Sequence, residues 1–321
     1  MKKNIVIVAG DPNSVNSEII YKTWKKLSLL TKKRLYIIGN YTLIVKQLKK
    51  INLKKKIIKL KEISLRNNTN ELKILDIPLK FKNPFNVNVN NSSDYILQSL
   101  SLAHKLSIEK KVGGMINCPI DKRLLAKSKK IGVTEYLASK CGIRNNSEVM
   151  MLFNKELAVV PLTTHIGIKK ISKKITTSLI IKKINVLNKD YTKIFKKKPK
   201  IGVLGLNPHN GELRKNSEEK KIIIPAISKL KKNYINIQGP LVADTTFISK
   251  YKNFDVIVGM YHDQVLGPFK TLFKFDAINI TLGLNYVRVS PDHGPAKDII
   301  NKNKADHVSL LRCVKFIDNL N

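Results

Sequence analysis

Three histidines stand directly after short apolar segments, each in a polar turn: His165 in Thr-Thr-His, His209 in Asn-Pro-His-Asn-Gly-Glu and His262 in Tyr-His-Asp-Gln. Neutral imidazole is a common ligand of divalent metal ions, and three protein ligands leave one coordination position open for a substrate. A lone histidine in a turn is more often a hydrogen-bonded structural residue, but three in equivalent positions favour a metal site. Asp263 is a candidate general base or, alternatively, a carboxylate that orients His262.

The segments around these histidines alternate between short apolar runs and longer amphipathic runs, which predicts an α/β protein with a largely parallel or mixed sheet. In such sheets ligands collect where strands end, so the fold is expected to position the histidines. The expected strands are 5–9, 35–38, 114–116, 149–153, 157–160, 200–204, 256–258 and 277–281. The expected helices are 17–30, 42–50, 93–110, 121–128, 134–140, 171–188, 217–231 and 305–319.

The composition excludes several other classes of protein. A net charge of +37 suggests a nucleic-acid partner, but the lysines occur in nearly every segment and arginine is scarce. This distribution indicates a drift in amino-acid usage, and we expect no specific nucleic acid, only nonspecific polyanion binding. No segment has the length and apolarity of a membrane span or a secretory signal. Three separated cysteines without a CxxC pair fit reduced thiols in the cytoplasm.

Seven motifs occur in order along the chain: Gly10-Asp11-Pro12, Thr134-Glu135-Tyr136-Leu137-Ala138, Thr164-His165, Gly205 to Glu212, Gly239-Pro240 with Ala243-Asp244-Thr245, Met260 to Gln264, and Thr281 to Leu284. With this ordered set, the chain resembles the 4-hydroxythreonine-4-phosphate dehydrogenase family from residue 5 to about 310. The resemblance implies a two-lobed α/β/α fold similar to isocitrate and isopropylmalate dehydrogenases, with a cleft between the lobes. We expect one lobe at about 1–125 with 240–321 and the other at 126–239.

The resemblance also implies a homodimer with shared active sites, in which the histidines matching His165, His209 and His262 hold a divalent metal (Zn, Mg or Co) and the last comes from the other subunit. The implied substrate contacts are Thr134, Lys270, Asn279 and Arg288. The stretch from Ser290 to Ile299 is similar to the cofactor loop of the wider decarboxylating dehydrogenases. It implies that NAD or NADP is bound by His293, Gly294, Ala296 and Asp298.

The implied reaction is oxidation of 4-phosphohydroxy-L-threonine to a 2-amino-3-oxo acid phosphate, which loses CO₂ in pyridoxal phosphate biosynthesis. Val133 departs from the family pattern, because the family has a substrate-contacting histidine at this position. It keeps open a sister dehydrogenase of threonate or erythronate phosphate; a degenerate non-catalytic relative and a basic nucleic-acid-binding protein are more distant alternatives. Asn301 and Asn303 replace usual glycines, and asparagine tolerates the left-handed backbone that such turns need.

Overall fold

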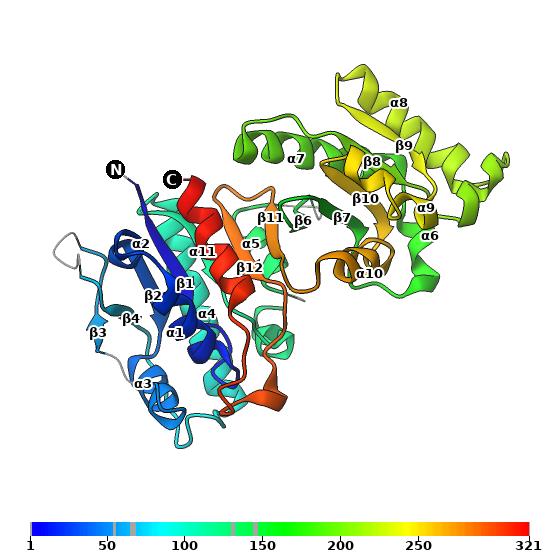
Figure 1. The fold of residues 1–321 in the computed structure, drawn as a ribbon. Coiled ribbons are helices and arrows are strands. Elements are labelled where there is room, and N and C mark those ends of the chain that lie inside the picture. Colours follow the sequence, from blue (N-terminus) through cyan, green and yellow to red (C-terminus); the bar gives the residue numbers. More distant parts are fainter. Residues whose placement is uncertain (1, 54–55, 65–68, 130–131, 144–146, 321) are drawn as a thin grey trace. The chain divides into compact units, whose positions relative to one another are not determined.

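The computed structural model describes residues 2–53, 56–64, 69–129, 132–143 and 147–320. The chain forms two compact units (Figure 1). Unit 1 consists of residues 1–142 and 284–321, and unit 2 of residues 143–283. Each unit is built on its own set of strands, so the α/β fold class and the two-lobed organisation expected from the sequence are confirmed.

The strands of unit 1 lie in the order β3-β4-β2-β1-β5-β12, and all of their pairings are parallel. The sequence predicted three of them and missed β3, β4 and β12, in which charged side chains interrupt the apolar pattern. The strands of unit 1 are β1 (Asn4–Val8), β2 (Leu35–Gly39), β3 (Ile57–Leu60), β4 (Leu72–Asp76), β5 (Val112–Asn117) and β12 (Arg288–Pro291).

The longer helices cover this sheet because they present an apolar stripe to it. Helix α4 packs against β1, β2 and β5, while α11 packs against β12, β5 and β1. Asparagine side chains cap the first turns of α3 and α4. The helices of unit 1 are α1 (Asn16–Lys26), α2 (Leu29–Arg34), α3 (Tyr41–Lys50), α4 (Val89–Ile108), η2 (Lys122–Ser128), α5 (Val133–Lys140), η7 (Lys297–Ile299) and α11 (Val308–Leu320).

The strands of unit 2 lie in the order β11-β6-β7-β10-β8-β9. The β11–β6 and β6–β7 pairs are antiparallel, whereas β7, β10, β8 and β9 run parallel. The sequence predicted a largely parallel or mixed sheet, and the sheet of unit 2 is mixed; strand β9 was missed. The strands of unit 2 are β6 (Val149–Phe153), β7 (Ala158–Thr163), β8 (Ile201–Leu204), β9 (Ile237–Leu241), β10 (Val256–Tyr261) and β11 (Ile278–Leu282).

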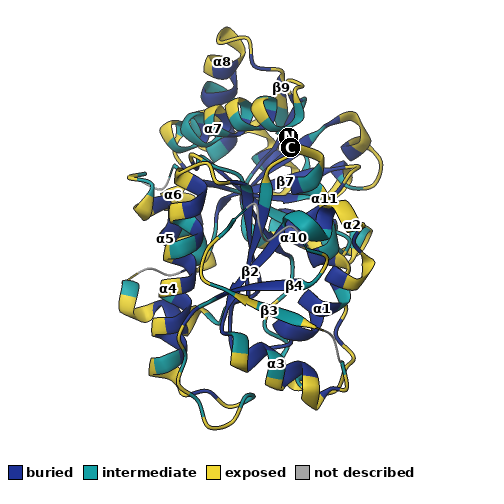
Figure 2. Ribbon diagram, turned by 90° about the vertical axis from the view of Figure 1, so that its left-hand side faces the viewer, coloured by how far each residue is buried: buried dark blue, intermediate teal, exposed yellow. Residues whose placement is uncertain are grey.

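Helix α10 packs against β7 and β10, and α7 packs against β6, β7 and β11. Buried side chains of α10, among them Val265 and Phe269, join Val159 and Ile257 of the sheet in one apolar core. In Figure 2 strands such as β2 and β4 are drawn mostly as buried and the edge strand β3 is not, while helices such as α4 and α7 alternate between buried and exposed positions. The helices of unit 2 are η3 (Ile168–Lys170), α6 (Ile171–Lys174), α7 (Thr177–Phe195), η4 (Pro208–Leu213), η5 (Glu219–Ile223), α8 (Ile224–Lys232), α9 (Ala243–Thr246), η6 (Lys250–Asn253) and α10 (His262–Phe273).

The boundaries between the units differ from those expected at 125/126 and 239/240. The chain leaves unit 1 after residue 142 because α5 packs against η2 there. It stays in unit 2 until residue 283 because β10 pairs with β7 and β8, and β11 pairs with β6. Helix α10 itself was not expected, since Gly267 and Pro268 lie inside it and both disfavour a helix interior.

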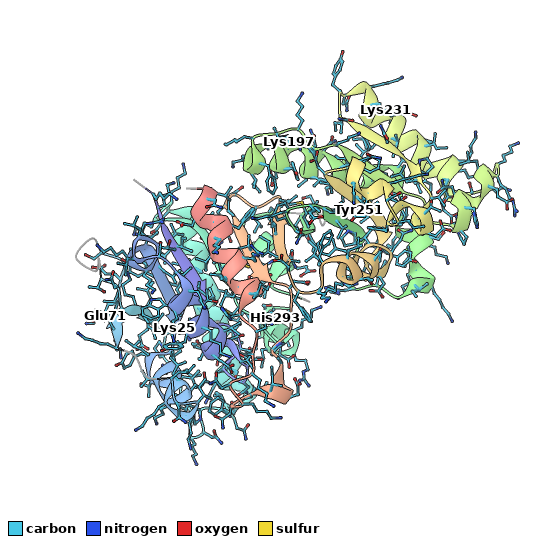
Figure 3. All side chains as sticks on the ribbon, viewed as in Figure 1. Lys25, Glu71, Lys197, Lys231, Tyr251 and His293 are labelled. Carbon is cyan, nitrogen blue, oxygen red and sulfur yellow. The ribbon has the colours of Figure 1, made fainter. Side chains whose placement is uncertain are left out.

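The positive charge is carried by both units. Lys25 of unit 1 and Lys197 and Lys231 of unit 2, all labelled in Figure 3, are exposed. This distribution agrees with the interpretation that the net charge reflects a drift in amino-acid usage along the whole chain. Among the described residues, no helix has the length and apolarity required to cross a bilayer.

One lysine departs from this pattern. Lys73 of β4 is fully buried, and its ammonium donates hydrogen bonds to the backbone carbonyls of Lys32, Lys33 and Thr69 at 3.1, 2.6 and 3.2 Å. It also lies 4.6 Å from the ring centroid of Tyr36. Burial disfavours the charged form and lowers the pKa of Lys73 to about 8.

This lysine predicts a pH dependence of stability. Between about pH 8 and 10.5 the unfolded chain holds the Lys73 proton more tightly than the folded chain, so the free energy of unfolding should rise with pH. Urea denaturation between pH 7.5 and 10 should therefore show the wild type gaining stability relative to Lys73→Met. Lys61→Met, which changes an exposed lysine, should follow the wild type. A wild-type-to-Lys73→Met difference that is constant over this range would contradict the assignment.

Candidate functional site

The three histidines singled out in the sequence follow the carboxyl ends of three neighbouring parallel strands of unit 2. His165 follows β7, His209 follows β8, and His262 follows β10, which lies between the other two (Figure 1). Parallel strands end at the same edge of a sheet, so the fold brings the three turns together there. The expectation of equivalent strand-end positions is therefore confirmed.

His165 and His262 of the same chain approach each other closely. Their ring centroids are 6.1 Å apart. His262 begins α10, and its Nδ1 lies 2.7 Å from Oδ1 of the exposed Asp263. With Nδ1 as the donor, this contact leaves Nε2 facing away from the carboxylate and available as an acceptor. Within the described part of the chain, no group of three or more His, Cys, Asp or Glu side chains is close enough to hold a metal ion.

His209 lies in a left-handed turn. His209, Asn210, Gly211, Glu212 and Leu213 all have positive φ, between 48° and 57°. His165 is also left-handed, with φ of 37°. For a residue other than glycine, the left-handed conformation costs roughly 1–2 kcal/mol. The contacts around these turns must therefore hold them in place. Such strain is typical of functional sites.

A buried carboxylate supports the turn that carries His209. Glu219 has no exposed surface. Its Oε1 accepts hydrogen bonds from the backbone amides of Leu206 and Asn207, both at 2.8 Å, and its Oε2 accepts one from Nδ2 of Asn207 at 3.0 Å. Burial alone would raise the pKa of Glu219, but the hydrogen bonds from Asn207 and Leu206 outweigh it and hold that pKa below its usual value.

Two further side chains connect the strand ends. Gln264 accepts a hydrogen bond from the Met260 amide at 2.7 Å and donates one to the Gly205 carbonyl at 2.8 Å, which links β10 to the turn after β8. Thr163 donates to the Met260 carbonyl at 2.7 Å, which links β7 to β10. The sequence alone indicated no role for Gln264, Thr163 or Glu219, although Gln264 lies inside the Met260 to Gln264 motif.

In unit 1 the structure brings Arg288 and Thr134 together. Arg288 is 3% exposed at the start of β12; its Nε donates to Oδ1 of Asn117 at 2.7 Å and its Nη1 to Oγ1 of Thr134 at 3.2 Å. Asn117, the buried last residue of β5, was not singled out from the sequence, although a polar residue ending an apolar strand was the available signal. Burial lowers the pKa of Arg288 to about 10, so the guanidinium is still charged at neutral pH. Val133 is the residue that begins α5, directly before Thr134.

The remaining predicted substrate contacts lie in unit 2. Asn279 on β11 has a buried Oδ1 atom with no hydrogen-bond partner among the described residues. Lys270 lies in the last turn of α10, with its ammonium 5.9 Å from the ring centroid of Phe275.

The predicted cofactor loop follows β12, and Figure 3 labels His293 on it. His293 Nδ1 lies 2.9 Å from the Gly294 carbonyl, while its Nε2 is buried without a partner in the described chain. The loop is held to the first turn of the chain by the hydrogen bond from the Val15 amide to the Pro295 carbonyl at 3.2 Å. The side chain of Lys297 also donates to Oδ2 of Asp121 at 2.8 Å.

The backbone of this loop is left-handed at several non-glycine positions. Ala296, Asn301 and Asn303 have φ of 49°, 63° and 54°. The expectation that the two asparagines would take the place of glycine in these turns is confirmed. Gly294 is exposed and not left-handed, and a Cβ atom built there would meet no described atom within 4 Å.

Comparison with solved structures defines the class of protein. A β-decarboxylating dehydrogenase from Thermococcus kodakarensis gives a TM-score of 0.51 at 8% identity, covering 97% of this chain and 81% of that chain, a likeness that shows the fold alone. A 4-hydroxythreonine-4-phosphate dehydrogenase from Burkholderia phymatum gives a TM-score of 0.82 at 32% identity, with 100% and 98% of the two chains covered. The chain therefore has the two-lobed fold of these dehydrogenases.

The sequence comparisons identify the family. The family model described as pyridoxal phosphate biosynthetic protein PdxA matches residues 31–317. A 4-hydroxythreonine-4-phosphate dehydrogenase of Sulfurihydrogenibium sp. is 37% identical over 97% of this chain and 96% of its own length. A protein of Oceanobacillus iheyensis provisionally named D-threonate 4-phosphate dehydrogenase is 35% identical, with 98% and 96% covered. The chain belongs to the PdxA family.

The packing around Gly205 gives a test of the unit 2 site. A Cβ atom at Gly205 would lie 2.2 Å from Oδ1 of Asn210 and 3.1 Å from Oε1 of Glu219. Gly205→Ala should therefore lower the free energy of unfolding by about 1–3 kcal/mol, the usual cost of overpacking. Gly267→Ala is the matched control, because its Cβ meets nothing within 4 Å and alanine favours the helix. Equal urea stability of Gly205→Ala and wild type would show that Asn210 and Glu219 are not held against Gly205.

Proposed function

We propose that this chain is a cytoplasmic, NAD(P)- and divalent-metal-dependent dehydrogenase that oxidises 4-phosphohydroxy-L-threonine in pyridoxal phosphate biosynthesis. The observation that carries the proposal is the placement of three histidines at the ends of neighbouring parallel strands in a member of the PdxA family. The three cysteines, all free thiols, are compatible with a reducing compartment.

The reaction converts the secondary alcohol at C3 into a ketone. The C3 hydrogen would leave as hydride, for which a nicotinamide held by the loop of His293 and Gly294 would supply the acceptor, and the hydroxyl proton would pass to a base. The resulting 2-amino-3-oxo acid phosphate loses CO₂ and takes up a proton to give 3-amino-2-oxopropyl phosphate. When bound, the metal supplies Lewis acidity and the nicotinamide supplies the hydride acceptor; the chain must bind and orient the reactants.

His165, His209 and His262 are the proposed metal ligands, and three imidazoles fit Zn or Co better than Mg, which prefers oxygen ligands. Within one chain the His165 and His262 ring centroids are 6.1 Å apart, so the edge of unit 2 that carries His165 also carries the His262 that would be contributed to a second copy. The contact between Asp263 and His262 supports the orienting role for Asp263. The contact engages Oδ1 alone, so Oδ2 of Asp263 also remains the candidate base.

Anionic groups of the substrate are assigned to Arg288 and Lys270. A buried guanidinium already held by Asn117 and Thr134 is pre-oriented, and its planar donors suit a phosphate or carboxylate. Thr134 is positioned beside it in the first turn of α5. In unit 2, the unpartnered Oδ1 of Asn279 supports a contact with a hydrogen-bond donor of the substrate, such as its amino group.

The dinucleotide is assigned to the loop that carries His293, Gly294, Ala296 and Asp298. Nothing within the described chain requires a glycine at position 294, since its backbone is not left-handed and the space above it is open. A ligand that passes close to the backbone would explain the missing side chain. The buried Nε2 of His293 supplies an unused polar atom on the same loop.

The proposed enzyme is a homodimer in which His262 completes the metal site of the second copy. His165 and His209 are exposed, and exposed apolar side chains flank them: Ile166 at 38%, Ile168 at 80% and Leu213 at 47%. A second copy related by a two-fold axis near this edge would cover these side chains and bring its own His262 beside the first copy's histidines.

A second candidate function is oxidation of another four-carbon 4-phosphorylated acid, such as threonate or erythronate phosphate. Val133, in place of the family's substrate-contacting histidine, and the likeness to a protein provisionally named D-threonate 4-phosphate dehydrogenase favour it. The two candidates share the metal, the dinucleotide and the phosphate contacts. They differ in the group at C2, which is an amine in one and a hydroxyl in the other.

A substrate comparison tests the proposal. The wild type should reduce NAD⁺ or NADP⁺ with 4-phosphohydroxy-L-threonine, should lose this activity after metal removal by a chelator, and should regain it with Co²⁺, Zn²⁺ or Mg²⁺. Val133→His should lower KM for this substrate about fivefold, the equivalent of roughly 1 kcal/mol from one restored hydrogen bond. Activity confined to threonate or erythronate phosphate in both proteins would assign the chain to the sister function. Sequence-specific nucleic-acid binding without dehydrogenase activity would defeat both.

A further inference from the structure

The left-handed turn that carries His209 is held from inside unit 2 rather than by its own sequence. Only one of its five left-handed residues is glycine, Gly211. Without other contacts, His209, Glu212 and Leu213 would favour ordinary right-handed or extended backbone. The position of the His209 imidazole therefore depends on what fixes the residues on either side of the turn.

Glu219 contacts this turn from both directions. Its carboxylate binds the amides of Leu206 and Asn207, which lead into the turn. A Cβ atom at Gly211, inside the turn, would lie 3.0 Å from its Oε2. The side chain of Asn210 closes the turn against the sheet by donating to the Pro240 carbonyl at 3.0 Å.

The same support is linked to His262. The Gly205 carbonyl, one residue before Leu206, accepts the hydrogen bond from Gln264, and Gln264 also binds the Met260 amide at the end of β10. A Cβ at Gly205 would lie 3.1 Å from Glu219, so the carboxylate packs against the residue that Gln264 holds. Gln264 and Glu219 thus hold the same short segment, Gly205 to Asn207: Gln264, two residues after His262, contacts its first residue, and Glu219 contacts the two that lead to His209.

We propose that Glu219 is a positioning residue, whose buried carboxylate sets the left-handed turn of His209 so that the imidazole is presented to the divalent ion shared with His165 and His262. This inference rests on the proposed metal site. A carboxylate suits the task because both of its oxygens only accept, and donors face it: the backbone amides of Leu206 and Asn207 and the side-chain amide of Asn207 are among them. Hydrogen bonds to an ionised acceptor are about twice as strong as neutral ones.

The test is Co²⁺ titration of the metal-free, full-length protein, followed by visible absorption, together with hydrogen exchange of residues 206–213. Glu219→Ala should weaken Co²⁺ binding about 10- to 100-fold, the usual effect of losing a group that supports a metal ligand, and should speed exchange in that segment. Glu219→Gln, which keeps one acceptor oxygen, should retain much of the affinity. Glu156→Ala, at an exposed glutamate in the β6–β7 turn, is the matched control and should behave as wild type.

The outcomes separate the inference from the function on which it rests. Wild-type affinity for Co²⁺ in both Glu219 variants, or unchanged exchange at 206–213, would overturn the inference while leaving the metal site intact. Reduced thermal stability of Glu219→Ala with unchanged Co²⁺ affinity would reduce Glu219 to a structural role and would also overturn it. If Glu219→Ala does not fold, Glu219→Gln must show a measurable loss of Co²⁺ affinity. A wild-type protein that binds no Co²⁺ would overturn the metal site itself, and with it the role of Glu219.

Discussion

The parallel pairing of β7, β10 and β8 is the constraint on which the unit 2 site depends. Because the three strands run in the same direction, their carboxyl ends reach one edge of the sheet, and the turns that follow carry His165, His262 and His209. The backbone hydrogen bonds of the sheet fix the positions of the three strand ends, independently of the side chains of the site. Thr163 and Gln264 then tie the strand ends to one another through Met260 and Gly205.

In unit 1 the main constraint is the burial of a charged guanidinium, that of Arg288. Arg288 begins a strand beside β5, so the last residue of β5, Asn117, meets its Nε, and Thr134 of α5 meets its Nη1. Neutral oxygens hold and orient the cation there. The same strand leads directly into the loop of His293 and Gly294. Arg288 and the loop proposed to bind the dinucleotide are thus positioned by one short strand, whereas the three proposed metal ligands of unit 2 are positioned by the ends of three strands.

The sequence predicted the fold class and the strand-end positions of the histidines, because buried parallel strands are apolar runs and the turns after them are polar. It missed β3, β4 and β12, where Lys59, Lys73 and Arg288 interrupt the apolar pattern, and it missed α10, which contains Gly267 and Pro268. The sequence also could not indicate the residues that hold the histidine turns in place. Glu219 follows His209 by ten residues in a charged segment, and only the fold shows that it turns inward.

The central claim is that His165, His209 and His262 hold one ion, with His262 supplied by the second copy. It is tested most directly by mixing two inactive variants, His209→Ala and His262→Ala, under conditions that exchange subunits. The account predicts recovery of about one quarter of wild-type activity, because half of the dimers are mixed and each mixed dimer regains one intact site. No recovery, with both variants folded and the mixed dimer demonstrated, would place all three ligands in one chain. Substantial activity of either variant alone would contradict the three-histidine site.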